Sequence, residues 1–201
     1  MIGPQEPPHT IEPLLGTGEQ PSIVACLGSS GTAGKGQAFN WITELQRRLG
    51  QRRFVFRNFG VGGDLAYNAL QRLSDVKASC PKKMVVLIGG NDVLALVSTK
   101  ARRFFRLSKR LPRDPSPEWF CENLQALASR AKAETSAAIA LCSLPPIGED
   151  PMSTNPFQSE LNRRIEEFSA IIRGIAREEG TDSMADGFYA RCRLSCIAGS
   201  G

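Results

Sequence analysis

Four short, mostly apolar segments alternate along the chain with stretches of helical periodicity. The segments are 22–27, 54–59, 83–88 and 137–144, and each is followed directly by Gly or Pro. The first, third and fourth are continuously apolar rather than alternating, which is typical of strands buried on both faces of a parallel sheet. The pattern therefore clearly predicts four parallel strands.

Three other stretches repeat apolar residues at helical spacing. One of them follows Ser116 and Pro117, where serine is a good N-cap and proline suits the first helical position. The apolar positions are Ala38, Trp41, Ile42, Leu45 and Leu49; Phe120, Leu124, Leu127 and Ala131; and Leu161, Ile165, Phe168, Ile172 and Ile175. Strands that alternate with helices predict an α/β fold with a doubly wound parallel sheet.

The chain of 201 residues fits one domain with a substantial core. We expect a disordered, proline-rich leader at 1–20 and a single domain at 21–201, whose part from about 180 onward is atypical. No segment approaches the roughly 20 apolar residues that span a bilayer, and the leader lacks the apolar core of a secretory signal. We therefore expect a cytoplasmic protein without a transmembrane segment.

Basic residues are scattered, except in the segment 100–113, which holds seven of them and no acidic residue. This segment is interpreted as a solvated loop or helix face. The alternative is a basic flap that contacts an anionic substrate or a membrane surface. Its aromatic residues do not alternate with the basic ones as in proteins that bind single-stranded DNA, so we expect no nucleic-acid partner. The oligomeric state stays open.

The six cysteines do not predict a disulfide framework. Cys26 and Cys142 lie inside apolar segments, where a free thiol behaves as a small hydrophobic group. Cys192 and Cys196 lie close together in the tail, with no histidine beside them. We therefore expect reduced thiols, no metal site and no cofactor.

Polar, glycine-rich segments follow the first three predicted strands, at 28–36, 58–64 and 89–92. Ligands of open α/β sheets bind outside the carboxyl ends of the strands. Three loops from adjacent strands should therefore converge on one site.

The first of these loops does not match a phosphate-binding loop. Gly28 and Gly34 are too far apart, and Gly36 follows Lys35 where a serine or threonine should stand. Two interpretations remain. One is a nucleophilic serine at the turn from strand to helix, where N–H groups of the helix start stabilise an oxyanion. The other is a flexible turn.

The second and third loops carry further candidate groups. Three glycines within 60–63 let the backbone approach a ligand and present an N–H group. Asn91 can aim its amide at the same site, and Asp92 can cap the helix that follows. Alone, either loop is also compatible with an ordinary turn.

Together these segments resemble the SGNH (GDSL-like) hydrolase superfamily. The residues concerned are GSS at 28–30, NFGVGGD at 58–64, GGND at 89–92 and LPPIGED at 144–150. Their order and spacing agree with those of the family over roughly residues 21–178. The resemblance implies a flavodoxin-like three-layer α/β/α sandwich. It also implies hydrolysis of small-molecule acyl esters or thioesters through an acyl-serine.

By position, the resemblance assigns the nucleophile to Ser30. It assigns the oxyanion hole to the N–H groups of Ser30 and Gly63 and to the side-chain amide of Asn91. Such donors act on charge that develops only in the tetrahedral intermediate, and each can contribute roughly 3 kcal/mol.

The chain departs from the family pattern in two places. Ser29 stands where the family has an aspartate, which predicts a softer loop. The D-x-x-H motif of the family is matched only by DGFY, with Asp186 in the aspartate position and Tyr189 in place of the histidine base. Tyrosine, with a pKa near ~10, is a poor base at neutral pH. The single histidine, His9, is interpreted as a solvated residue of the leader.

The segment after about 180 shows neither the apolar fifth strand nor the amphipathic last helix of the family. We hypothesise a truncated or frameshifted C-terminus, which would expose an edge of the fourth strand. Two functions remain open for the candidate site, beside the basic flap at 100–113. One is an ester hydrolase with reduced activity, and the other is a pseudo-hydrolase that binds an acyl or acetylated ligand without catalysis.

Overall fold

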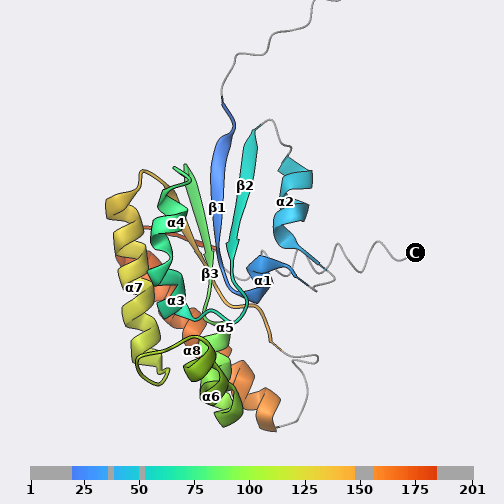
Figure 1. Cartoon of the computed structure of the whole chain (residues 1–201), viewed down its shortest axis with the longest axis vertical. Helices are drawn as coiled ribbons and strands as arrows, with labels where there is room; N and C mark the ends of the chain where they lie inside the picture. The colour runs from blue at the N-terminus through green and yellow to red at the C-terminus, as the bar shows by residue number, and fades with distance from the viewer. Residues whose placement is uncertain (1–19, 36–38, 50–52, 148–155, 185–201) are drawn as a thin grey trace, which may run out of the picture.

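The computed structural model describes residues 20–35, 39–49, 53–147 and 156–184 (Figure 1). Within these residues, five parallel strands form one sheet in the order β2-β1-β3-β4-β5, which is the strand order of flavodoxin-like folds. The strands are β1 (Ser22–Gly28), β2 (Phe54–Gly60), β3 (Lys83–Leu87), β4 (Ala138–Cys142) and β5 (Asp182–Met184). The predicted leader lies almost entirely outside the described residues.

Strand β5 corrects the expectation that no fifth strand follows the last helix. It pairs with β4 from Ala140 opposite Asp182 to Cys142 opposite Met184. The pairing uses only backbone groups, and polar residues are common on edge strands. A three-residue strand at the edge of the sheet therefore needs no continuous apolar sequence. Strand β5 covers the edge of β4 that was expected to be exposed.

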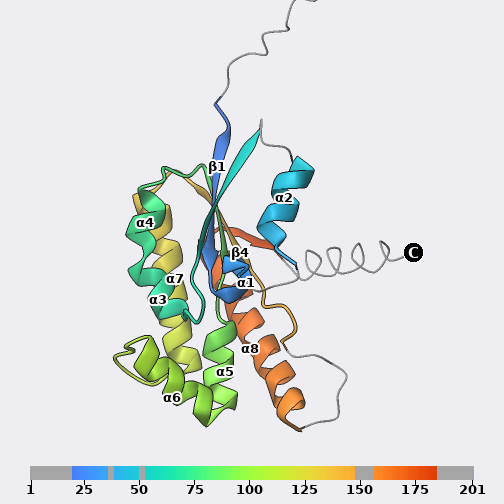
Figure 2. The same cartoon turned by 45° about the vertical axis from the view of Figure 1, so that its right-hand side comes forward.

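Helices lie on both faces of the sheet (Figures 1 and 2). Helix α2 covers one face, and α3, α4, α7 and α8 cover the other, so the predicted α/β/α sandwich is confirmed. The helices are α1 (Ser30–Ala33), α2 (Trp41–Leu49), α3 (Ala66–Gln71), α4 (Leu73–Lys77), α5 (Gly90–Val97), α6 (Thr99–Ser108), α7 (Pro117–Glu134) and α8 (Pro156–Glu178).

The larger core cluster lies between the sheet and helices α7 and α8. The hydroxyl of Ser116 accepts a hydrogen bond from the N–H of Trp119 at 3.2 Å, which confirms the predicted cap of α7. All five predicted apolar positions of α8 are buried, and Phe168 packs on Phe120 with ring centroids 4.5 Å apart. The buried apolar stripe of α2 is shorter than predicted, because Leu49, the last residue of the helix, is 47% exposed.

Two cysteines belong to the smaller core cluster on the α2 side of the sheet. Cys26 and Cys142 are free and buried there, as the sequence predicts. Burial raises the pKa of each thiol to about 12. Both therefore stay protonated at neutral pH and pack as small apolar groups.

The carboxyl ends of three strands lie at one level of the sheet. Gly28, the last residue of β1, is opposite Gly60 on β2 and Leu87 on β3. The three loops that follow these strands therefore start side by side, at the end of the molecule where α1 and α5 lie (Figure 1).

Backbone packs directly on backbone at this end. A Cβ atom at Gly60 would lie 2.2 Å from the backbone nitrogen of Ala33, and one at Gly28 would lie 2.4 Å from the carbonyl oxygen of Leu87. Neither neighbour can rotate away, because both are backbone atoms. Glycine at position 60 therefore lets α1 pack on the end of β2, and glycine at position 28 lets β1 lie close to the end of β3.

Gly60→Ala should lower the free energy of unfolding by about 1–3 kcal/mol, because the added methyl group forces the backbone of α1 away from β2. Urea denaturation followed by circular dichroism measures this change. Gly62→Ala is the matched control, since nothing lies within 4 Å of a Cβ there. Equal destabilisation by the two substitutions would contradict the close packing.

Candidate active site

Ser30, the predicted nucleophile, is the first residue of α1 and is exposed. The backbone carbonyl of Ser29 accepts hydrogen bonds from the N–H groups of Thr32 and Ala33 at 3.2 and 2.9 Å, which begins the helix. Among the described residues, neither the hydroxyl nor the N–H of Ser30 has a hydrogen-bond partner. The free N–H is expected at a helix start. Both groups are therefore available to a ligand.

The second loop is hydrogen-bonded to the first. The N–H of Val61 donates to the carbonyl of Gly28 at 3.0 Å, and the side-chain amide of Asn58 donates to the carbonyl of Thr32 at 2.8 Å. The N–H of Gly60 in turn donates to the Asn58 side chain at 2.8 Å. These bonds hold the first loop, although the Ser29 side chain makes no capping bond of its own.

Gly63 adopts a backbone conformation that favours glycine. Its φ of +79° is in the left-handed region, and a Cβ there would lie 2.8 Å from Cε of Lys109. Its N–H has no acceptor within the part of the chain that the structure describes. A free backbone donor therefore stands in the second loop at the position predicted for the oxyanion hole.

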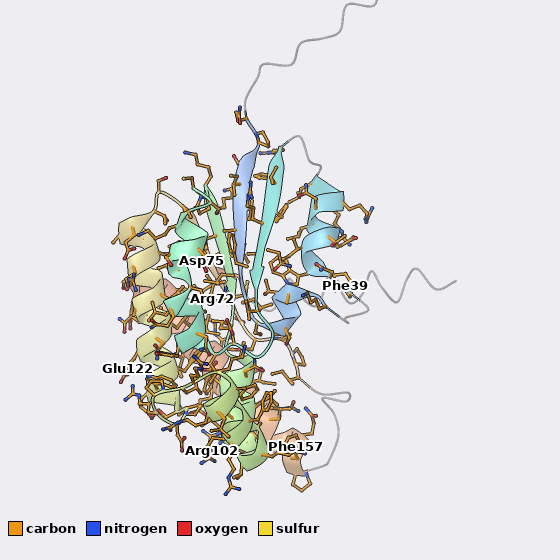
Figure 3. The ribbon with its side chains drawn as sticks, viewed as in Figure 1. Phe39, Arg72, Asp75, Arg102, Glu122 and Phe157 are labelled. Atoms are coloured by element: carbon orange, nitrogen blue, oxygen red, sulfur yellow. The ribbon has the colours of Figure 1, made fainter. Side chains whose placement is uncertain are left out.

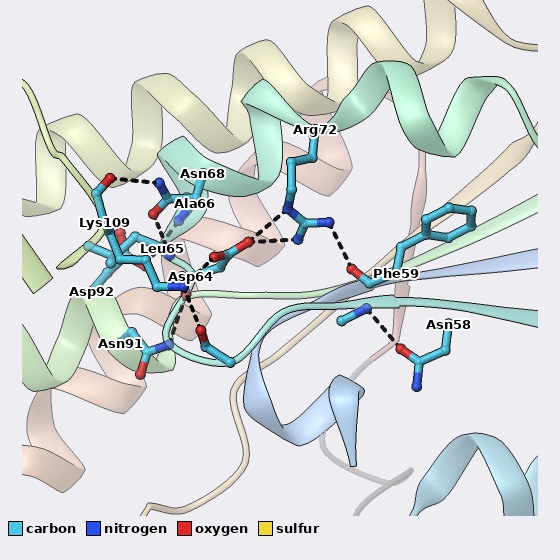
Figure 4. A network of polar contacts seen from close by, with 12 residues as sticks. Asn58, Phe59, Asp64, Leu65, Ala66, Asn68, Arg72, Asn91, Asp92 and Lys109 are labelled. Carbon is cyan, nitrogen blue, oxygen red and sulfur yellow. Dashed lines mark hydrogen bonds and ion pairs between the residues drawn. The ribbon is translucent and has the colours of Figure 1, made fainter. Parts of the chain in front are cut away.

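Asn91 joins the third loop to the second. It lies in the first turn of α5, is 8% exposed, and donates its side-chain amide to the carbonyl of Asp64 at 2.9 Å (Figure 4). A primary amide carries two hydrogens, and this bond uses one of them. The bond therefore fixes the orientation of the amide and leaves one hydrogen for a ligand.

Asp64 is the centre of an ion-pair network that sequence analysis missed (Figure 4). Its carboxyl group is almost fully buried and accepts hydrogen bonds from Nε of Arg72 and Nζ of Lys109, both at 2.9 Å. Arg72 also donates to the carbonyl of Phe59 at 3.1 Å, and Lys109 to that of Gly62 at 2.6 Å. The network therefore fixes the second loop on both sides of Gly60–Gly63.

Asp92 has a different role from the predicted one. Gly89, not Asp92, is the N-cap of α5. The Asp92 carboxyl group, which lies inside the first turn, accepts a hydrogen bond from the N–H of Ala66 at 3.2 Å and so caps the start of α3. Burial raises its pKa to about 8, and the bond from Ala66 opposes this shift only in part.

The three predicted residues Ser30, Gly63 and Asn91 therefore lie on three loops that hydrogen bonds connect. Asp186 and His9 lie outside the described residues, as does Tyr189. The ranges that the structure describes contain no histidine and no group of three or more side chains suited to hold a metal ion. Their helices are also too short or too polar to cross a membrane.

A family model described as the GDSL-like lipase/acylhydrolase family matches residues 26–189. The chain therefore belongs to this family, as the three loop motifs predicted. A serine nucleophile and an oxyanion hole are typical of the family. No curated protein matches the chain.

Three solved structures, two of them of acetyl xylan esterases, share the fold. The crystal structure of TesA is 26% identical, with a TM-score of 0.58, and the match covers 81% of this chain and 77% of that one. The acetyl xylan esterase AlAXEase is 23% identical, with a TM-score of 0.62 and coverage of 80% and 75%. Axe2, an acetylxylan esterase from Geobacillus stearothermophilus, is 17% identical, with a TM-score of 0.63 and coverage of 83% and 77%.

Asp64→Asn should lower the free energy of unfolding by about 3 kcal/mol, because it leaves Arg72 and Lys109 partly buried without their countercharge. Chemical denaturation measures the loss. Asp75→Asn, on the exposed surface of α4, is the matched control and should change stability by less than about 0.5 kcal/mol. A similar small effect at both positions would show that the network contributes little.

Asp92 should make the protein less stable as the pH rises. An unfolded aspartate titrates near ~3.9, whereas the folded one titrates near 8, so the folded state binds one more proton between these values. Stability from this group is complete below ~pH 4 and is lost at up to about 1.4 kcal/mol per pH unit as the pH rises toward 8. Asp92→Asn keeps the acceptor for Ala66 and should remove this slope.

Urea denaturation of both proteins at several pH values between ~4 and ~8 tests the assignment. The stability of the wild type relative to Asp92→Asn should decline steadily over that range. Parallel curves for the two proteins would contradict a raised pKa at Asp92.

Proposed function

We propose that this protein is a serine hydrolase of small acyl esters, with Ser30 as the nucleophile. The observation that carries the proposal is the chain of hydrogen bonds across the three loops. Val61 binds the second loop to Gly28, and Asn91 binds the third loop to the second. An exposed hydroxyl and three donors thereby belong to one connected unit at the carboxyl ends of adjacent strands.

In the proposed reaction, Oγ of Ser30 attacks the acyl carbon and loses its proton to a base. The carbonyl oxygen becomes an oxyanion, which accepts hydrogen bonds from the N–H groups of Ser30 and Gly63 and from the amide of Asn91. When the carbonyl re-forms, the C–O bond to the alcohol breaks, and the alcohol leaves with a proton. Water then cleaves the acyl-serine by the same steps and releases the acid.

The base is the part of this reaction that the described residues do not supply. The only histidine of the chain is His9; in the family pattern Asp186 would orient a histidine at position 189, where this chain has Tyr189. An oxyanion hole and substrate binding alone retain roughly 10³–10⁴-fold acceleration over water when a triad residue is removed. We therefore propose slow turnover, with acylation limited by removal of the Ser30 proton.

The second candidate is a pseudo-hydrolase that binds an acyl or acetylated ligand without turnover. The presence of a single histidine, at position 9, favours it. The donors of Ser30, Gly63 and Asn91 would then bind a carboxylate or ester carbonyl as a stable ligand. Both candidates use the same three donors and differ only in whether Ser30 reacts.

Ser30→Ala should lower hydrolysis of p-nitrophenyl acetate to the rate that the oxyanion donors alone support, and should abolish covalent labelling by a fluorophosphonate. Labelling requires a reactive serine, so it reports the nucleophile even when turnover is slow. Ser29→Ala is the matched control. It removes the adjacent hydroxyl, which makes no capping bond, and should leave both readouts unchanged.

Equal ester hydrolysis by the wild type and Ser30→Ala, with no labelling of either, would rule out a nucleophilic Ser30. Acetate or butyrate binding, followed by isothermal titration calorimetry, then tests the second candidate. Binding that Asn91→Leu removes would support the pseudo-hydrolase. Binding that this substitution leaves intact would contradict it.

A further inference from the structure

One face of α6 combines exposed apolar side chains with cations. Lys100, Arg103, Phe104 and Leu107 follow the i, i+3, i+4, i+7 spacing and so share one side of the helix. Phe104 is 61% exposed and Leu107 is 79% exposed. The opposite side of the helix packs inward through Phe105, which is 6% exposed. We call the group of four residues the outer face of α6.

The seven cations of the segment 100–113 differ in what they bind. Four of the seven are engaged within the protein: Arg102 with the carbonyl of Ala95, Arg106 with Asp114, Lys109 with Asp64, and Arg113 with Glu122. Lys100, Arg103 and Arg110 have no acidic partner among the described residues. Two of these three free cations, Lys100 and Arg103, belong to the outer face.

A shallow cavity lies beside the outer face. Its volume is about 440 Å³, and it is lined by Thr99, Arg102, Arg103, Arg106, Leu107 and Asp114. Three arginines against one aspartate leave the lining positively charged. Such a cavity suits an anionic group, and Leu107 at its rim suits an adjoining apolar chain.

We propose that the outer face of α6 docks the protein on an anionic lipid surface. Phe104 and Leu107 enter the boundary between headgroups and acyl chains, while Lys100 and Arg103 bind the phosphate groups. Charge complementarity selects this partner, because the outer face has cations and no acid. Two large apolar side chains beside these cations distinguish a lipid surface from a purely polar polyanion.

The position of α6 relates this surface to the candidate site. Helix α6 packs on α5, which begins within the third loop, and both helices lie at the end of the molecule toward which the strands point (Figure 1). Arg102 and Phe157 lie at this same end, away from Asp75 (Figure 3). Lys109, which caps α6, binds the carbonyl of Gly62 in the second loop. Docking does not rest on the chemistry of Ser30, so either proposal can fail alone.

Co-sedimentation of the full chain with lipid vesicles tests the docking. The wild type should bind vesicles of phosphatidylcholine and phosphatidylglycerol in equal parts and should not bind phosphatidylcholine alone. Lys100→Gln/Arg103→Gln should weaken binding about 30-fold, which corresponds to about 2 kcal/mol. Added salt should weaken binding of the wild type more than that of this variant.

A separate variant removes the two apolar side chains of the outer face. Phe104→Ser/Leu107→Ser should weaken vesicle binding at least about tenfold at every salt concentration, because the inserted apolar area is lost. The four substituted side chains of the outer face are all exposed, so we expect the variants to fold. Urea midpoints equal to that of the wild type should show this.

Two matched controls change the same chemistry elsewhere. Lys82→Gln/Lys83→Gln removes two exposed cations at the amino end of β3, and Phe39→Ser/Leu49→Ser removes two exposed apolar side chains near α2. Both controls should bind vesicles as the wild type does.

Three outcomes would overturn the proposal. The first is absence of wild-type binding to the anionic vesicles, or equal losses in the outer-face variants and their controls. The second is that the wild type binds duplex DNA as tightly as it binds vesicles, and that Phe104→Ser/Leu107→Ser binds both as the wild type does. This result would indicate a general polyanion site. The third is a dimer in sedimentation velocity that the outer-face variants dissociate, without vesicle binding, which would identify a second copy as the partner.

Discussion

A carboxylate that is almost removed from water needs countercharges, and Asp64 has two. Its side chain binds Arg72, between α3 and α4, and Lys109, at the end of α6, while its backbone carbonyl accepts the amide of Asn91. Desolvation of each charge costs several kcal/mol, so the ions are stable in this position only together. This one residue thereby fixes how the second loop, the third loop and α6 lie relative to one another.

Much of the fold could be predicted because it depends on local patterns. The stripe of α8 and the Ser116 cap of α7 are properties of consecutive residues, and the three loop motifs follow the strands that they extend. The partners of Asp64 could not be predicted in this way. Lys109 lies 45 residues from it, within a segment whose charge suggests a solvated face. Strand β5 was missed because its backbone pairing needs no apolar pattern, and Asp92 because it caps a helix other than its own.

The candidate site divides into two parts of different physical origin. The Ser30 and Gly63 donors are backbone groups, and their positions follow from strand register and from glycine at close contacts. Such a framework tolerates changes in most side chains. In the family pattern the base, in contrast, is a single histidine side chain from a later segment. A chain of this family can therefore keep an oxyanion-binding framework while the group that removes the serine proton changes.

The strand order has a consequence for how the protein folds. Each pair of neighbouring strands is joined by a crossover that contains at least one helix, so no pair can form as a hairpin. The interior strand β1 is the first to be synthesised, yet its two neighbours, β2 and β3, come later and from well-separated segments. Pairing of this kind is slow, since loop closure precedes any gain from contacts. The three loops can therefore come together only after β3 has joined the sheet, and a nascent chain that lacks β3 has no such site.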